Sequence, residues 1–276
     1  MNELLQLRLH QAPAVHSQHE VYYAEQGQGD LLLLVHGSLC DLRYWRWQLN
    51  KLASSLHVVS LSLPGYWPSE PRYMAYDFNL DNHCAAVADV IQAVRQPQQK
   101  VHLLGHSRGA QVVTHYLNLY PNTVDSVILA DPAFRLHQPS IPLAVLDQAA
   151  TLIVAGAEVE GLNVFIDAVS GPSTWSQMVG WFKTMVQDNA HTLIAQSREA
   201  MPIVGQAHIN ALKQLPTLLV SGELSPARYK QSVETLHHVL PQARGSVIAK
   251  ASHGMNLANP KAFNQALLDF IQEVKV

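Results

Sequence analysis

The chain has 276 residues, of which 48% are hydrophobic and 14% charged, and its 18 basic and 21 acidic side chains leave a net charge of −3. Soluble domains are typically about 25% charged, so this composition excludes a disordered or highly charged protein, and the near balance of charge argues against nucleic acid or an anionic membrane as a partner. The two cysteines, Cys40 and Cys84, are too few for a disulfide scaffold.

No segment of the sequence is typical of a membrane span or a secretion signal. The apolar runs, such as 31–35, are far shorter than the ~18 residues that cross a bilayer. Segment 1–9 contains Glu3 and lacks the basic end, apolar core and small-residue cleavage site of a signal peptide. We therefore expect a cytoplasmic globular protein, either a monomer or a homodimer.

The first half of the chain alternates short apolar runs with amphipathic stretches. Segments 4–10 and 21–25 predict an early hairpin. The expected buried strands are 31–36, 57–63, 101–105 and 127–130, and the expected helices are 81–94 and 111–120. Strand, helix, strand in this rhythm indicates a parallel sheet with right-handed crossovers.

The rhythm breaks from 137 to 215, where the sequence is mostly helical and rich in large apolar side chains. After Pro216 it returns, with expected strands and helices at 217–221, 226–240, 246–249 and from 260 to the end. We therefore predict an α/β fold with a mostly parallel, twisted sheet flanked by helices. Segments 1–136 and 216–276 would form its core, and 137–215 an inserted helical lid.

The sequence Gly105-His106-Ser107-Arg108-Gly109 lies between a predicted strand and a predicted helix. In that setting G-x-S-x-G forms a sharp turn that holds the serine in a strained conformation, with its hydroxyl above the sheet edge. The two glycines are needed because larger side chains would collide across the turn. The amides and dipole of the following helix favour negative charge at the same point. We therefore predict that Ser107 is a nucleophile.

Four stretches resemble the α/β-hydrolase fold superfamily, in its lid-bearing esterase, C–C hydrolase and haloperoxidase-like branch. They are the serine motif, Val35-His36-Gly37-Ser38 with Trp45, Pro64-Gly65-Tyr66-Trp67-Pro68-Ser69, and Ser252-His253-Gly254 followed by Pro260 and Phe263. The resemblance covers the chain outside the lid.

The resemblance implies roles for three further residues. His253 lies late in the chain, after the last predicted strand, where the superfamily has its general base. The backbone N–H groups of Ser38 and Arg108 would form the oxyanion hole. The Arg108 side chain is expected to face solvent, with a substrate carboxylate as its alternative partner. Metal ligation is not expected: His10, His16 and His19 are close in sequence, but no carboxylate or cysteine completes a ligand set.

The triad acid departs from the common pattern. The superfamily typically has Gly-x-x-Asp after the strand at 217–221, but this chain reads Gly222-Glu223-Leu224-Ser225. Asp131 follows the strand at 127–130, and several lid-bearing relatives resemble the chain in placing the acid there. Pro132 predicts extended backbone at Asp131. We favour Asp131 as the acid, with Glu223 as the alternative.

The predicted activity is hydrolysis of a small or medium ester, lactone or related carbonyl compound by a Ser107–Asp131–His253 triad through an acyl-enzyme. The enzyme would be carboxylesterase-like, with a C–C hydrolase as a second option, and would need no cofactor and no metal. Its partner would be a small-molecule substrate. Large apolar residues of the lid, such as Trp175, Trp181, Phe182 and Phe165, would line the substrate pocket; alternatively, they form the packing core of the lid itself. The alternatives are a cofactor-independent oxygenase or haloperoxidase-like enzyme, or a non-catalytic ligand receptor.

Overall fold

The computed structural model describes the chain except for residues 1–6, 70–77, 138–142, 200–202 and 275–276. Its described part contains one eight-stranded sheet in the order β1-β2-β4-β3-β5-β6-β7-β8. The strands are β1 (His10–Ala12), β2 (Val21–Gln26), β3 (Leu31–Val35), β4 (His57–Leu61), β5 (Val101–His106), β6 (Ser126–Ala130), β7 (Thr217–Gly222) and β8 (Arg244–Ile248). Pairing is antiparallel for β1–β2 and β2–β4 and parallel from β4 to β8.

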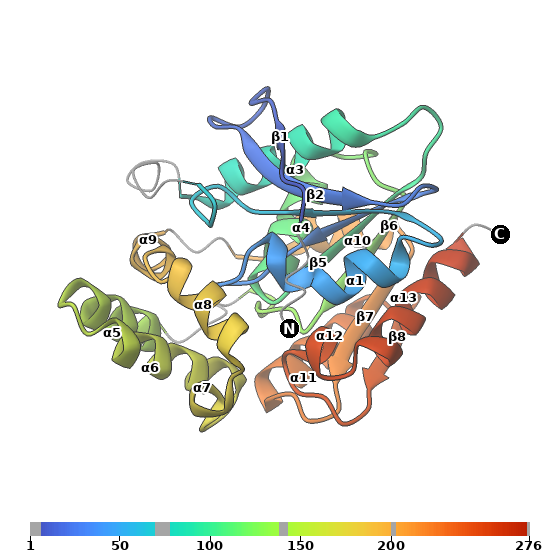
Figure 1. Cartoon of the computed structure of the whole chain (residues 1–276). Coiled ribbons are helices and arrows are strands. Elements are labelled where there is room, and N and C mark those ends of the chain that lie inside the picture. The colour runs from blue at the N-terminus through green and yellow to red at the C-terminus, as the bar shows by residue number, and fades with distance from the viewer. Residues whose placement is uncertain (1–6, 70–77, 138–142, 200–202, 275–276) are drawn as a thin grey trace.

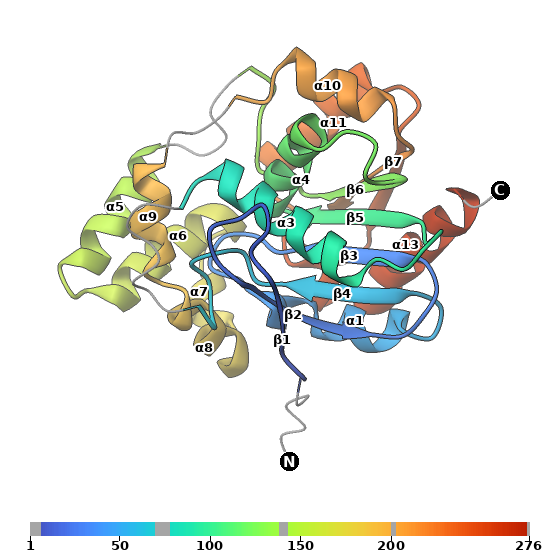
Figure 2. The same cartoon turned by 90° about the horizontal axis from the view of Figure 1, so that it is seen from above.

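The central strands are buried on both faces, which explains their almost wholly apolar sequences. Every residue of β3 and β6 is buried, as parallel strands covered by helices require. One face packs against α3 (Leu80–Val94), α4 (Arg108–Leu119), α10 (Gln206–Lys213) and α11 (Ala227–Val239). The other packs against the 3-10 helix Leu42–Trp45, α1 (Arg46–Leu52), α12 (Met255–Ala258) and α13 (Pro260–Val274). Figure 2 shows α3, α4 and α10 on the opposite side of the sheet from α1.

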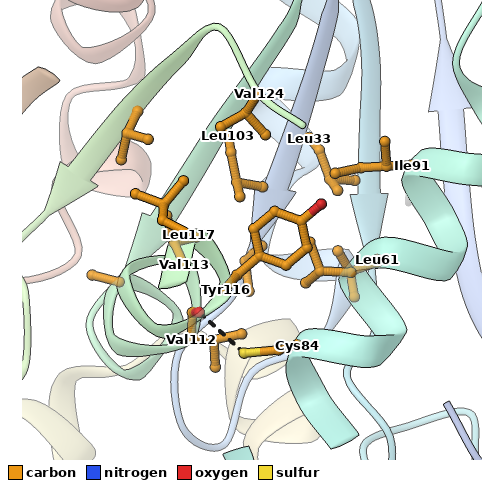
Figure 3. Close-up of a cluster of buried hydrophobic side chains, with 14 of the residues drawn as sticks. Leu33, Leu61, Cys84, Ile91, Leu103, Val112, Val113, Tyr116, Leu117 and Val124 are labelled. Atoms are coloured by element: carbon orange, nitrogen blue, oxygen red, sulfur yellow. Dashed lines mark hydrogen bonds between the residues drawn. The ribbon is translucent and has the colours of Figure 1, made fainter. Parts of the chain in front are cut away.

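Figure 3 shows how the first of these layers packs. Leu33 and Leu103 from neighbouring strands meet Tyr116 of α4 and Ile91 of α3, and all four are at least 94% buried. Cys84 lies in the same layer, where its thiol contacts the carbonyl oxygen of Val112 at 3.4 Å. Burial of each such apolar side chain contributes about 1.5–3 kcal/mol to the stability of the folded state.

The described residues between β6 and α10 form five helices, which gather beyond one end of the sheet (Figure 1). They are α5 (Leu143–Val154), α6 (Glu158–Ser170), α7 (Thr174–Gln177), α8 (Gly180–Asp188) and α9 (Thr192–Arg198), here called the inserted helices. They share an apolar cluster that includes Leu162, Phe165 and Leu193. The assignment of 137–215 to a lid stays a prediction. Within that range, α10 packs with the sheet layer through Ile209 and Leu212.

Polar contacts tie the inserted helices to the sheet core. The buried Asp41 carboxylate accepts hydrogen bonds from Arg43 and from the amide of Asn189 at 2.7 Å. Arg43 also pairs with Asp188 at 2.8 Å, and Asn189 accepts a hydrogen bond from the Trp67 N–H. Because Asp41 and Asn189 are fully buried, breaking this network would leave uncompensated polar groups.

The main departures from the predicted elements lie near the ends of the sheet. The first strand is His10–Ala12, whereas the predicted segment 4–10 lies partly outside the described residues. The last strand is Arg244–Ile248 rather than 246–249, and its exposed side chains gave little apolar signal. Within the described helices, none combines the length and apolarity that a bilayer crossing demands.

Candidate active site

The strand order reverses between β3 and β5, and the residues of interest follow these two strands. β4 lies on one side of β3 and β5 on the other, so the loops that leave β3 and β5 diverge and open a crevice at the carboxyl edge of the sheet. Gly37 and Ser38 leave β3, and Ser107 leaves β5. The topology therefore brings two of the predicted elements of the site together.

Ser107 occupies the sharp turn between β5 and α4. Its backbone has φ 55° and ψ −119°, a conformation that costs a non-glycine residue about 1–3 kcal/mol. The two motif glycines allow the turn to close, because a Cβ at Gly105 would overlap the backbone of Gly109 and a Cβ at Gly109 would overlap that of Val35. The predicted turn is thus observed, and its strain is maintained by close backbone packing.

His253 and Asp131 are brought together although 122 residues separate them. The His253 Nδ1 lies 3.0 Å from the Asp131 Oδ2, and both side chains are buried. The end of β6 is joined to the serine turn, since the Ser107 N–H donates to the Ala130 carbonyl and the Ala133 N–H to the Ser107 carbonyl. These backbone bonds place Asp131 beside the turn.

The backbone at Asp131 differs from the predicted extended conformation. Its φ is 40°, in the left-handed region that aspartate tolerates better than most residues. Its N–H donates to the Val220 carbonyl of β7. This bond to the neighbouring strand holds the residue in a conformation that the following proline does not predict.

Glu223, the alternative acid, lies elsewhere. Its carboxylate accepts a hydrogen bond from the Lys250 N–H at 2.7 Å, at an exposed position. Ser225, at the position where the superfamily has its aspartate, donates to the Asp131 Oδ2 at 2.5 Å and accepts from the Gly222 N–H at 3.1 Å. The serine that replaces the usual acid therefore supports the carboxylate of Asp131.

Burial dominates the electrostatics of the His253–Asp131 pair. It raises the pKa of Asp131 to about 7, against the hydrogen bonds from Ser225 and Gly222, which favour the carboxylate. It lowers the pKa of His253 to about 3, with the Arg228 charge acting in the same direction. The imidazole is therefore neutral at physiological pH, as a general base must be.

Activity that depends on this pair is expected to fall as the pH drops through about 7, where Asp131 gains a proton. Ser225→Ala removes a donor that favours the carboxylate, so it should move the acidic limb of the kcat/KM profile upward by about one pH unit. The measurement is kcat/KM from pH 5 to 9 for both proteins. Glu223→Gln is the control, and an unshifted Ser225→Ala profile would contradict the assigned role of Ser225.

Two aromatic rings enclose His253. The ring of Tyr229 in α11 stacks on the imidazole with centroids 3.9 Å apart and an interplanar angle of 9°. The ring of His106 lies 4.6 Å away, and its Nε2–H donates to the His253 carbonyl at 2.8 Å. The sequence analysis missed Tyr229. Its position in the first turn of a helix that starts near the carboxyl edge of the sheet is the signal that could have found it.

The loop after β3 runs against the serine turn. A Cβ at Gly37 would lie 2.9 Å from the Ser107 Cβ, so only glycine permits this approach. His36 braces the loop: its Nδ1 donates to the Gly37 carbonyl at 2.8 Å and its Nε2 accepts from the Leu63 N–H at 3.0 Å. Burial lowers the pKa of His36 to about 4. The ring stays neutral and holds the loop that leads to Ser38 against the serine turn.

Arg108 does not face solvent, as the sequence analysis expected, and its guanidinium is not free for a substrate carboxylate. Its side chain is 2% exposed and pairs with Glu199, which follows α9, at 2.8 Å. His83 and the ring of Phe78 also contact the guanidinium. A buried cation needs a partner of opposite charge. For Arg108 that partner is Glu199, 91 positions further along the chain. The backbone N–H of Arg108 still lies in the first turn of α4, where helical N–H groups lack intrahelical acceptors.

A cavity of about 150 Å³ lies between the serine turn and the inserted helices. Ser38, Ser107, Tyr229 and His253 contribute to its wall, and most of the remainder is apolar. The apolar wall residues are Cys40, Tyr44, Phe165, Ile166, Val169, Met178, Phe182 and Val186.

The predicted pocket residues divide between the cavity wall and the outside. Phe165 and Phe182 line the cavity, whereas Trp175 and Trp181 are not among the described residues of its wall. Instead, the Lys183 ammonium lies over the Trp175 ring and the Arg46 guanidinium over the Trp181 ring. Hydrophobicity alone could not separate these environments. Among the described residues, no three His, Cys, Asp or Glu side chains gather as metal ligands would.

Comparison with known proteins agrees with this architecture. A family model for the alpha/beta hydrolase fold matches residues 30–260, and the chain belongs to this family. It is 23% identical to the (E)-2-((N-methylformamido)methylene)succinate hydrolase of Acinetobacter baylyi, over 91% of this chain and 94% of that one. It is also 23% identical to the pimeloyl-[acyl-carrier protein] methyl ester esterase of Vibrio vulnificus, over 91% and 98%.

Solved structures show the same fold. A thermophilic esterase from Thermogutta terrifontis superposes with a TM-score of 0.78 at 19% identity, over 98% of this chain and 100% of that one. A bromoperoxidase from Bacillus anthracis gives 0.78 at 20%, over 96% and 100%. The predicted fold class, the family resemblance and the prediction of an α/β-fold hydrolase are confirmed.

Proposed function

We propose that this chain is a serine hydrolase that cleaves small, uncharged carboxylic esters or lactones by an acyl-enzyme mechanism. The observation that carries the proposal is the shared cavity: Ser107, on its strained turn, and His253, hydrogen-bonded to Asp131, both line one largely apolar space. A pure binding protein has no need for a strained serine beside a buried base.

In the proposed reaction, Ser107 Oγ attacks the carbonyl carbon and His253 Nε2 takes its proton. Asp131 holds the ring through Nδ1 and stabilises the imidazolium that forms. The amides of Ser38 and Arg108 bind the oxyanion. His253 then protonates the leaving oxygen, and the C–O bond breaks. Water hydrolyses the acyl-enzyme with the same base and restores Ser107.

The size and polarity of the cavity favour a short, neutral acyl group. About 150 Å³ accommodates only a small group, and no lysine or arginine is among the described wall residues. Two described arginines near the reacting groups have partners: Arg108 pairs with Glu199, and Arg228 donates to the Ala168 carbonyl. The described part of the cavity wall therefore offers no cation for a substrate carboxylate of the kind that the name of its Acinetobacter baylyi relative implies.

The test compares p-nitrophenyl butyrate with p-nitrophenyl hemisuccinate, which has a similar length but ends in a carboxylate. Because a buried unpaired charge is costly, we expect kcat/KM for the butyrate to be at least about 100-fold higher. Equal values would contradict the proposed substrate class. No turnover of any neutral ester, or turnover that consumes oxygen and survives Ser107→Ala, would contradict the proposed function.

A further inference from the structure

Tyr229 is a phenol of the described cavity wall that stacks on the ring of His253 and lines the same space as Ser107. Its side chain is only 3% exposed. Its ring lies flat on the imidazole, with an interplanar angle of 9°. The Ser107 side chain acts against burial on the pKa of this hydroxyl, and both side chains line the same cavity. Tyr229 and Ser107 therefore face the same cavity, with the Tyr229 ring against His253.

The neighbours of Tyr229 fix its position. Its ring is held between His253 and the Arg228 guanidinium, which lies 4.8 Å from the ring centroid. Arg228 in turn donates to the Ala168 carbonyl of α6, so the inserted helices and α11 both hold this stack. A phenol held in this way needs little reorganisation when charge develops beside it.

The position of the Tyr229 phenol determines which atom of a bound substrate it can contact. The oxyanion donors proposed above lie in the loop after β3 and in the first turn of α4. Tyr229 lies instead against His253, the group that must deliver a proton to the leaving oxygen. Burial raises the pKa of Tyr229 to about 12, so the phenol remains a neutral hydrogen-bond donor at any pH at which the protein would act.

We propose that Tyr229 is a further catalytic residue whose hydroxyl donates a hydrogen bond to the alcohol oxygen that leaves. This inference rests on the proposed function. The phenol keeps its proton throughout. The Ser107 Oγ–carbon bond forms, the carbon–alkoxy bond breaks, and the proton that Ser107 gave to His253 passes to the departing oxygen. The phenol stabilises the negative charge on that oxygen until the proton arrives.

The contribution of such a donor depends on the leaving group. An alkoxide is a poor leaving group and needs stabilisation, whereas p-nitrophenolate departs readily without it. The experiment therefore measures kcat/KM, which reports on acylation, for ethyl butyrate and p-nitrophenyl butyrate with wild type and Tyr229→Phe. Phenylalanine retains the stack on His253 and removes only the hydroxyl.

We expect Tyr229→Phe to lower kcat/KM for ethyl butyrate about 10- to 100-fold, as befits a lost hydrogen bond to a charged oxygen, with less than about a threefold loss for p-nitrophenyl butyrate. Equal losses of kcat/KM for the two esters would indicate that the hydroxyl has only a structural role in the site. No loss for either ester would indicate that it has no role in catalysis. Either result would overturn the inference.

Two controls separate this inference from the proposed function. Tyr116→Phe removes a buried hydroxyl that bonds Thr123 in the core, and it should leave the ratio of the two kcat/KM values unchanged. Ser107→Ala should abolish hydrolysis of both esters. Loss of both esters in Ser107→Ala with an unchanged ratio in Tyr229→Phe would leave the serine mechanism standing and remove only the role of Tyr229.

Discussion

Replacing Ser107 by alanine is expected to lower kcat for a neutral ester by on the order of 10⁶. The variant has no nucleophile, so neither the acyl-enzyme nor the two-step route exists. The oxyanion amides and the cavity remain, and they should leave some rate above that of the uncatalysed reaction. The measurement is steady-state hydrolysis of p-nitrophenyl butyrate.

Stability provides the internal control for this variant. Ser107 keeps its strained backbone through bonds made by its own N–H and carbonyl, and alanine keeps both groups. We therefore expect a melting temperature within a few degrees of wild type. A variant that is folded and retains more than about a hundredth of wild-type activity would contradict the role of Ser107.

Asp131→Asn is expected to lower kcat by on the order of 10⁴, because the amide cannot hold the required tautomer of His253 or stabilise its cation. The carboxylate is fully buried and lies 3.0 Å from Nδ1. Glu223→Gln is the matched control, since that carboxylate bonds the Lys250 backbone at an exposed position. A large loss in Glu223→Gln with little loss in Asp131→Asn would transfer the role of acid to Glu223.

The same substitution should raise stability above neutral pH. The folded pKa of Asp131 is raised to about 7, so the folded state binds the proton more tightly than the unfolded chain. The stability that this proton supplies is present below about pH 4 and lost as the pH rises through about 7. Asparagine stays neutral, so Asp131→Asn should melt at a higher temperature than wild type at pH 8. Loss of activity with gain of stability marks a functional rather than a structural residue.

Ser225 allows a second test of the acid position. Its hydroxyl lies 2.5 Å from the Asp131 carboxylate, at the position where the superfamily usually has aspartate. Ser225→Asp in the Asp131→Asn background should restore activity at least about 10-fold over the single variant. The single Ser225→Asp variant should be impaired, because two carboxylates would then share one buried site.

The sequence predicted the nucleophile turn well because its requirements are local. Gly105, Ser107 and Gly109 lie within five positions, between an apolar run and a helix, and a Cβ at Gly105 would overlap Gly109 of the same turn. The buried apolar strands were equally clear, since burial on both faces leaves few residue types. The histidine loop followed from its place near the end of the chain.

The features that the sequence did not predict depend on contacts between distant segments. The pairing of Arg108 with Glu199 and the support of Asp131 by Ser225 join residues 91 and 94 positions apart, and no local pattern encodes them. Tyr229 looked like an ordinary residue of an amphipathic helix. Trp175 and Trp181 share the composition of a pocket wall, but each ring lies under a cation, Lys183 or Arg46, and neither is among the described wall residues.

The central claim is that Ser107 is the group that attacks substrate, and the site of covalent labelling tests it most directly. Wild-type protein treated with a fluorophosphonate, digested and analysed by mass spectrometry should carry one phosphonyl group on the peptide that contains Ser107, and the Ser107→Ala and His253→Ala proteins should remain unlabelled. Labelling at any other residue, or undiminished labelling of Ser107→Ala, would contradict the account.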